Sequence, residues 1–192
     1  MSKRTRIGAL AALLALVGCA SVETRLQQPV TLDVIEDHDP FRDSRTFTAQ
    51  HWFVEGGPTS SVGLPDLSVT AVGYIHGDEH PEAPGASGTA LVIISDAGNW
   101  RFLRSRDVDL ILDGSERMHL GEASHDGDVY VITRVRVQER LVVPVTLEQL
   151  RRLGSASTVQ MQVGGVQVAL RPPSIEVFGV LAQRMAAELA GL

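Results

Sequence analysis

Apolar and polar residues alternate along much of the chain, with the two-residue period of strands that bury one face. Residues 45–54 (RTFTAQHWFV) and 67–75 (LSVTAVGYI) both carry this pattern. A stretch rich in glycine and proline, 55–66, separates them, and a loop-like stretch, 76–88, follows the second. The pattern therefore predicts two strands here, each followed by a loop.

Turn sequences divide the rest of this pattern into hairpins. Residues 89–95 (TALVIIS) and 100–104 (WRFLR) flank the turn DAGN and predict one hairpin. Asp113-Gly114 joins 107–112 to 116–124 in a second, and the HDGD turn at 125–128 leads into one strand over 129–138. The clearest hairpin joins TVQMQV to VQVALR through Gly164-Gly165.

Two helices are predicted near the carboxy terminus. Thr146 and Gln149 have the spacing of a capping box, and Gly154 is the expected end of this short helix. After Pro172-Pro173, Ser174 is the expected cap of a last helix over 174–190. The face of that helix expected to be buried carries Ile175, Phe178, Leu181, Ala182, Met185 and Leu189.

The total is about eight to ten strands and two helices, and strands follow strands without helical crossovers. This order predicts a mainly β or α+β domain. Its sheet is an antiparallel sheet, a two-sheet sandwich or an open barrel, with the last helix packed on it. A doubly wound α/β fold is disfavoured.

The amino terminus has a different character. Three basic residues fall within the first six, and the next eleven residues, 7–17, carry no charge. This is the pattern of a secretory signal peptide. The apolar run is too short for a transmembrane helix, which needs about 20 residues.

The run ends in Leu16-Val17-Gly18-Cys19, which resembles the lipobox of bacterial lipoproteins. The resemblance implies cleavage between Gly18 and Cys19, a diacylglycerol on the Cys19 thiol and an acyl chain on its new amine. It also implies an outer-membrane location facing the periplasm, because Ala20 stands where the inner-membrane retention signal has an aspartate. The expected organisation is a signal peptide over 1–18, a lipidated cysteine and tether over 19–30, and one domain over 31–192.

Charge and composition restrict the partners. Removing residues 1–18 takes away three of the 17 basic residues, which leaves 14 against 23 acidic residues and a net charge of about −9. Such a chain is a poor partner for nucleic acid or anionic lipid, and a basic protein surface or a divalent cation suits it better. Lys3 is the only lysine, so the mature chain is expected to carry out no Schiff-base chemistry.

The sharpest cluster of candidate ligands is HGDEH, in which His76, Asp78, Glu79 and His80 could hold Zn²⁺ or Cu²⁺. Gly77 and Pro81 argue against the helix on which zinc proteases carry their histidines, and a solvated loop is the favoured interpretation. The sequence fixes no third ligand, although His38 or His125 could come near in the fold.

Other candidate groups have simpler explanations. His51 and His119 are expected as ordinary strand residues, and His125 with Asp126 as the start of a tight turn. Asp107 and Asp109, with Asp113 beyond them, could form a glycosidase-like carboxylate pair, but an exposed sheet face explains them better. The Gly-x-Ser-x-Gly nucleophile motif is absent.

The sequence thus predicts a non-enzymatic lipoprotein, held on the bilayer through Cys19, that binds an envelope partner protein or supports envelope assembly. The alternative is a periplasmic protein that binds a divalent metal or a small ligand through the His76–His80 loop. No cofactor other than the attached lipid, and no nucleic acid, is expected.

Overall fold

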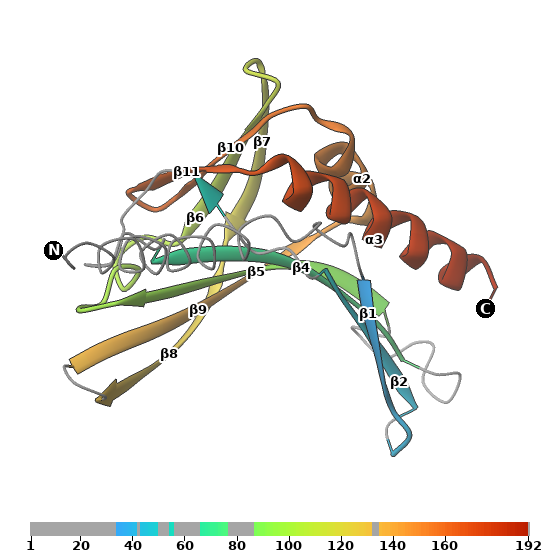
Figure 1. Ribbon diagram of the computed structural model, residues 1–192, viewed down its shortest axis with the longest axis horizontal. Coiled ribbons are helices and arrows are strands. Elements are labelled where there is room, and N and C mark those ends of the chain that lie inside the picture. The colour runs from blue at the N-terminus through green and yellow to red at the C-terminus, as the bar shows by residue number, and fades with distance from the viewer. Residues whose placement is uncertain are drawn as a thin grey trace, which may run out of the picture. The chain divides into compact units, whose positions relative to one another are not determined.

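The computed structural model describes residues 34–41, 43–49, 54–55, 66–76, 87–131 and 135–191 (Figure 1). These residues all belong to one unit of the chain, Leu32–Leu192. The described residues form two antiparallel sheets and two helices, so the expected mainly β architecture with a carboxy-terminal helix is confirmed.

The first sheet, called sheet A, has six strands. They are β1 (Val34–Asp39), β2 (Ser44–Ala49), β4 (Leu67–His76), β5 (Ser87–Ala97), β8 (Ser124–Val131) and β9 (Val135–Val145). Their order across the sheet is β1-β2-β4-β5-β9-β8, which leaves β1 and β8 at the two edges. Every neighbouring pair is antiparallel.

The second sheet, sheet B, has the order β3-β11-β10-β6-β7. Its strands are β3 (Val54–Glu55), β6 (Asp107–Leu112), β7 (Glu116–Glu122), β10 (Val159–Val163) and β11 (Val166–Leu170). At Ala123, which is buried, the chain passes directly from β7 of sheet B into β8 of sheet A.

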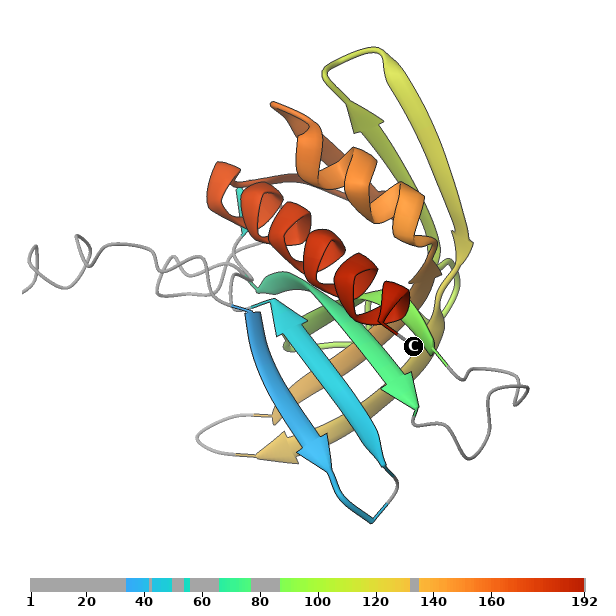
Figure 2. The same ribbon diagram turned by 90° about the vertical axis from the view of Figure 1, so that its right-hand side faces the viewer.

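Helices α2 (Leu147–Ser155) and α3 (Pro172–Ala190) lie side by side, and α3 packs on sheet A over β1, β2 and β4 (Figure 2). Gly73 allows the close approach to β4, because a Cβ atom there would overlap Met185 of α3. Gly154 and Gly179 similarly allow α2 and α3 to meet backbone to backbone. Glycine is required at these contacts for space.

The core follows the alternation read from the sequence. In β4 each second residue from Leu67 to Ile75 is buried, and β10 buries Val159, Met161 and Val163. The expected stripe of α3 is buried as well, with one exception, because Leu189 is 37% exposed. Val177, which the stripe did not include, is fully buried.

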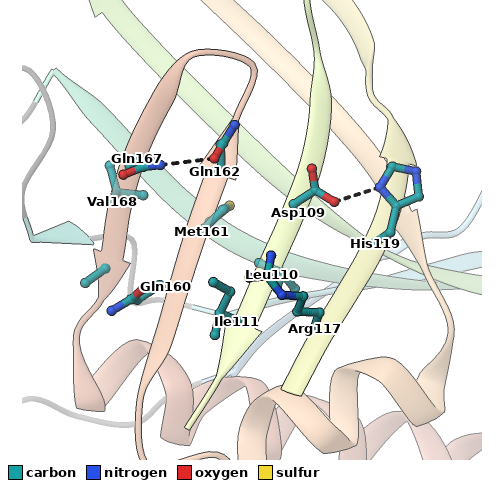
Figure 3. A pocket seen from close by; sticks show the side chains of 11 residues that line it. Asp109, Leu110, Ile111, Arg117, His119, Gln160, Met161, Gln162, Gln167 and Val168 are labelled. Atoms are coloured by element: carbon teal, nitrogen blue, oxygen red, sulfur yellow. Dashed lines mark hydrogen bonds and ion pairs between the residues drawn. The ribbon is translucent and has the colours of Figure 1, made fainter. Parts of the chain in front are cut away.

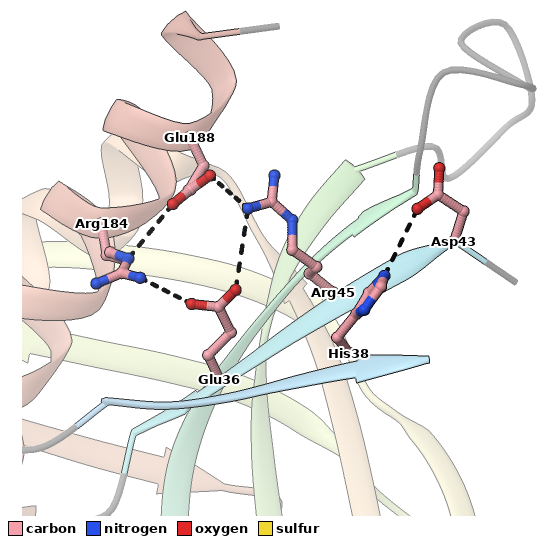
Figure 4. Close-up of polar contacts among 6 residues, drawn as sticks. All are labelled: Glu36, His38, Asp43, Arg45, Arg184 and Glu188. Carbon is pink, nitrogen blue, oxygen red and sulfur yellow. Dashed lines mark hydrogen bonds and ion pairs between the residues drawn. The ribbon is translucent and has the colours of Figure 1, made fainter. Parts of the chain in front are cut away.

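A network of ion pairs joins α3 to the β1–β2 hairpin (Figure 4). Arg184 lies 2.7 Å from Glu36, Arg45 lies 2.7 Å from Glu188, and the guanidinium of Arg184 also lies 5.8 Å from the centre of the buried Phe47 ring. These contacts fix the end of the helix on the edge of sheet A.

Three of the expected strands are wrong. Residues 101–104 form bends and Trp100 is in no regular element, because Phe102 inserts into the core and Glu139 holds the loop backbone. The single strand expected over 129–138 is the end of β8 and the start of β9, and HDGD lies inside β8. The strand expected over 45–54 ends at Ala49 as β2, whereas Val54 belongs to β3 in the other sheet. Alternation is the same on both arms of a hairpin, so it does not reveal where a strand folds back.

The helix ends are partly corrected. Thr146 and Gln149 form the expected capping box, but α2 runs past Gly154 to Ser155. Helix α3 begins at Pro172 with Arg171 as its cap, and Ser174 is buried inside the first turn. The hairpins expected at Asp113-Gly114 and Gly164-Gly165 are confirmed as β6–β7 and β10–β11.

Candidate functional site

A groove with a volume of about 690 Å³ lies on the face of sheet B (Figure 3). Four adjacent strands form it, and their outward residues are mostly polar. Its lining residues are Asp109, Leu110, Ile111, Arg117, His119, Gln160, Met161, Gln162, Gln167, Val168 and Ala169. Leu110, Met161 and Val168 are buried, so they tie the groove to the core.

An imidazole–carboxylate pair stands at one side of the groove. Nδ1 of His119 on β7 lies 2.8 Å from Oδ1 of Asp109 on β6, and the two residues are register partners. The register shifts beside Asp109, where Gly121 has a φ of +95°, so a bulge in the hairpin helps to set this pairing. The contact to Asp109 leaves Nε2 as the ring nitrogen available to a ligand.

Glutamine amides line the other side of the groove. Nε2 of Gln162 donates to the carbonyl of Gly164, and Nε2 of Gln167 donates to Oε1 of Gln162, both at 3.1 Å. These bonds orient both amides and leave the oxygen of Gln167 as an acceptor. Gln160 makes no side-chain hydrogen bond to any described residue, so its amide is available to donate and to accept.

Arg117 supplies the positive charge of the groove and makes no ion pair with a residue that the structure describes. Among the described lining residues none carries a hydroxyl or thiol group that could act as a nucleophile. The arrangement suits hydrogen bonding to a polar ligand that carries at most a small negative charge.

A second polar cluster surrounds Glu139, which is fully buried in β9. Its carboxylate accepts hydrogen bonds from the backbone N–H groups of Arg101 at 2.7 Å and Phe102 at 2.9 Å, and Nε2 of His125 lies 3.1 Å away. The Trp100 ring meets the His125 ring edge-on with centres 5.9 Å apart. Because donors surround the carboxylate, its role is to hold the loop that follows β5.

The guanidinium group of Arg101 also holds the loop that follows β5. Arg101 lies 2.7 Å from Oδ2 of Asp66, while Oδ1 of Asp66 has no partner among the described residues. Neither Glu139 nor Asp66 is among the candidate residues that the sequence suggested. The sequence does contain a sign that Glu139 is buried. It alternates in register with the apolar residues Val137, Leu141 and Val143, so it lies on the same face of the strand.

A third cluster lies on the opposite face of β8 and β9. Asp96 accepts hydrogen bonds from Tyr130 at 2.7 Å and Arg136 at 2.8 Å. Burial raises the pKa of Asp96, but these two hydrogen bonds and the charges of Arg136 and Arg101 outweigh it and hold the pKa below its ordinary value. The bond to Asp96 raises the pKa of Tyr130.

The expected metal loop is only partly visible. His76 ends β4 and its ring meets Tyr74 edge-on, whereas Asp78, Glu79 and His80 lie outside the described residues. The register pairs His76 with Ser44 and His38 with Arg45, so the two histidines point to opposite faces of sheet A. His38 is therefore no third ligand for His76, and His125 is bound to Glu139. Within the described part of the chain, no three His, Cys, Asp or Glu side chains are grouped to hold a metal ion.

The remaining expectations have mixed outcomes. Gly18, Cys19 and His51 lie outside the described residues. His119 is a strand residue as expected, whereas His125 and Asp126 lie inside β8 and start no turn. Asp107 and Asp109 are both on the exposed face of β6, as expected, but only Asp109 lines the groove. Asp113 accepts hydrogen bonds from the backbone N–H groups of Ser157 and Thr158.

Neither of the described helices, α2 and α3, has both the length and the apolar character needed to cross a membrane. In comparisons with known proteins, no family model, no curated protein and no solved structure matches this chain.

Proposed function

We propose that this protein is a lipid-anchored lipoprotein of the bacterial outer membrane that faces the periplasm and binds a glycan-type ligand without catalysing a reaction. The Leu16–Cys19 lipobox supports the anchor. The groove of sheet B supports the binding role, and its amide-rich lining is the observation that carries the proposal.

The ligand class follows from the chemistry of the groove. Gln160, Gln162 and Gln167 present amides that both donate and accept, as sugar hydroxyl and acetamido groups require. Neighbouring strands are about 4.8 Å apart, so the groove offers polar groups at regular intervals to an extended ligand. Arg117 can bind a single carboxylate, while the net charge of about −9 disfavours a polyanion. A glycan that carries short acidic peptides meets these conditions.

The expected tether fits such a partner. Fourteen residues, 20–33, lie between Cys19 and Val34, where β1 begins. At about 3.5 Å per residue, they allow the domain to reach at most about 50 Å from the bilayer. A single acyl chain gives only reversible membrane binding. Three acyl chains bury many more methylene groups in the bilayer, so they would hold this tether stably.

The anchor is tested on the natural protein and on a Cys19→Ala variant. Mass spectrometry of the natural protein should find an amino terminus at Cys19 with a diacylglycerol and an N-linked acyl chain. The variant should lose these groups and leave the membrane fraction. An intact Met1 or an unmodified thiol on the natural protein would contradict the anchor.

Ligand binding is tested by calorimetry with soluble peptidoglycan fragments. The protein should bind these fragments, and Gln160→Ala combined with Gln162→Ala should weaken binding about tenfold or more, because several hydrogen bonds are lost. Gln183→Ala is the matched control, since Gln183 is exposed on α3 and does not line the groove. Absence of binding by the unaltered protein, or equal binding by all variants, would reject the groove as a glycan site.

The alternative of a metal-binding loop at His76 remains a prediction of the sequence. Calorimetry with Zn²⁺ and Cu²⁺ tests it, and unchanged heats after His76→Ala and His80→Ala would reject it.

A further inference from the structure

The open edge of sheet A offers a second binding surface, independent of the groove. β8 is the last strand of the sheet, and no described strand pairs with its outer edge. It pairs with β9 over its full length of eight residues without a register shift. A regular edge strand of this kind can take up a further strand from another chain.

The backbone groups that face the open edge can be identified. The N–H of Gly127 donates to the Asp126 carboxylate at 2.8 Å, so it points away from β9. In an antiparallel pair, alternate residues direct both their N–H and C=O groups to the same neighbour. The backbone N–H and C=O groups of Val129 and Val131 therefore also face the open edge. Asp126 accepts a hydrogen bond from the N–H of Gly127 only, so it leaves the other edge N–H groups open.

The two faces of this edge differ in chemistry. Val129 is opposite the buried Val137, so it lies on the core-facing side, yet it is 54% exposed. Val131 is 69% exposed on the same side. Asp126 and Asp128 are exposed on the other side, and no ion pair joins Asp126 to Arg140, which is opposite it on β9.

The buried carboxylate of Glu139 fixes Trp100 on the apolar side of the β8 edge. Trp100 stands over Gly127, where a Cβ atom would lie 2.5 Å from the indole ring. The backbone beside Trp100 is bound to Glu139, which itself lies opposite Gly127. Trp100 thereby extends the apolar strip of Val129 and Val131 with a fixed, partly exposed ring.

We propose that the edge of β8 binds an extended segment of another envelope protein, added as a strand in which apolar and basic residues alternate. The apolar residues of the segment pack on Val129, Val131 and Trp100. Its basic residues face Asp126 and Asp128, and a cation that draws Asp126 aside releases the N–H of Gly127 for a main-chain hydrogen bond.

Charge argues against a second copy of this chain as the occupant. Pairing β8 with β8 of another copy would bring four carboxylates, from Asp126 and Asp128 of both chains, onto one face of the joined sheet. The net charge of about −9 on each mature chain adds repulsion.

The probe is a fluorescently labelled seven-residue peptide of alternating valine and arginine. The lipidated full-length protein is held in nanodiscs of zwitterionic phosphatidylcholine, with empty nanodiscs as the control for binding to lipid. One comparison peptide has glutamate in place of arginine, and another has the valines and arginines in separate blocks. The alternating basic peptide should bind about tenfold more tightly than either. No binding, or equal binding of the alternating and block peptides, would overturn the proposal.

Variants place the binding at β8. Val129→Pro should weaken binding about tenfold, because it removes an edge N–H while leaving the pairing with β9, whereas Val129→Thr should change it less than about threefold. Asp128→Arg should reverse the preference and favour the glutamate peptide, which a misfolded protein would not do. Unchanged peptide selectivity in Asp128→Arg would overturn the proposal. Self-association of the natural protein that Val129→Pro abolishes would also overturn it, since a second copy of the chain would then be the occupant. The glycan assay on the groove is unaffected by these outcomes.

Discussion

Nε2 of His125 lies 3.1 Å from Oε1 of Glu139, a carboxylate with no exposed surface. Two backbone N–H groups from the loop after β5 complete the surroundings of this carboxylate. One buried acid therefore joins β8, β9 and the Trp100 loop, and it also sets the position of the apolar strip beside the open sheet edge.

Glu139→Gln should destabilise the protein by about 2–4 kcal/mol, because the amide nitrogen cannot accept a hydrogen bond and leaves a buried N–H group unpaired. Urea unfolding measures the loss. Hydrogen exchange should show that the amides of Arg101 and Phe102 lose protection first.

Glu122→Gln is the control for this loss of charge. Glu122 is 61% exposed and pairs with Arg106 at the surface, so its replacement should cost less than about 1 kcal/mol. Equal destabilisation by the two variants would show that Glu139 has no special role in holding the loop.

The contact between α2 and α3 should tolerate alanine on one side only. A Cβ at Gly154 would overlap the backbone of Gly179, whereas a Cβ at Gly179 would lie 3.2 Å from the Gly154 carbonyl oxygen. Gly154→Ala should cost about 2–4 kcal/mol through overpacking. Gly179→Ala should stay within about 1 kcal/mol, because the better helix propensity of alanine offsets the tight contact. Urea midpoints test this order, and similar losses would contradict it.

The Asp96 cluster predicts a dependence of stability on acid. Its pKa in the folded protein is below the ordinary value of 3.8, so the stability from its bonds is present above that pH and is lost as the pH falls through the lower folded-state value. The difference in unfolding free energy between the natural protein and Asp96→Asn should therefore shrink below about pH 3.8. A difference that stays constant down to strong acid would contradict this assignment.

Tyr130 provides the complementary measurement at high pH. Its pKa is raised above 10.0, chiefly by the hydrogen bond it donates to Asp96, so the stability from the neutral phenol is lost only as the pH rises through the folded-state value. Asp96→Asn should move its titration, followed by ultraviolet absorbance, to lower pH. The Tyr74→Phe background isolates the signal of this residue, and an unmoved titration would show that Asp96 is not the cause.

Loss of the helix cap at α2 should have a moderate effect. Thr146→Ala removes the side-chain acceptor for the N–H of Gln149 and should cost about 1 kcal/mol. Thr146→Ser keeps the acceptor and should remain within a few tenths of a kcal/mol. Thermal unfolding of both variants checks the expectation, which equal losses would contradict.

The sequence by itself determined the local features of this protein. Alternation in β4 and β10, the capping box at Thr146 and the glycine turn at 164–165 depend on residues close together in the chain, so pattern and turn chemistry suffice to predict them. The expected lipidation of Cys19 likewise depends on a local motif, Leu16–Cys19.

Only the tertiary structure decided which strands pair and which charges meet. Alternation records which face of a strand is apolar but not its neighbour, so nothing local divides 129–138 between β8 and β9 or pairs Ile93 with Leu141. The groove exists because β6, β7, β10 and β11 pair, and Asp109 and Gln162 become neighbours only in that register. Likewise Glu139 can be buried as a charged group only where distant backbone donors converge on it, which is a property of the whole fold.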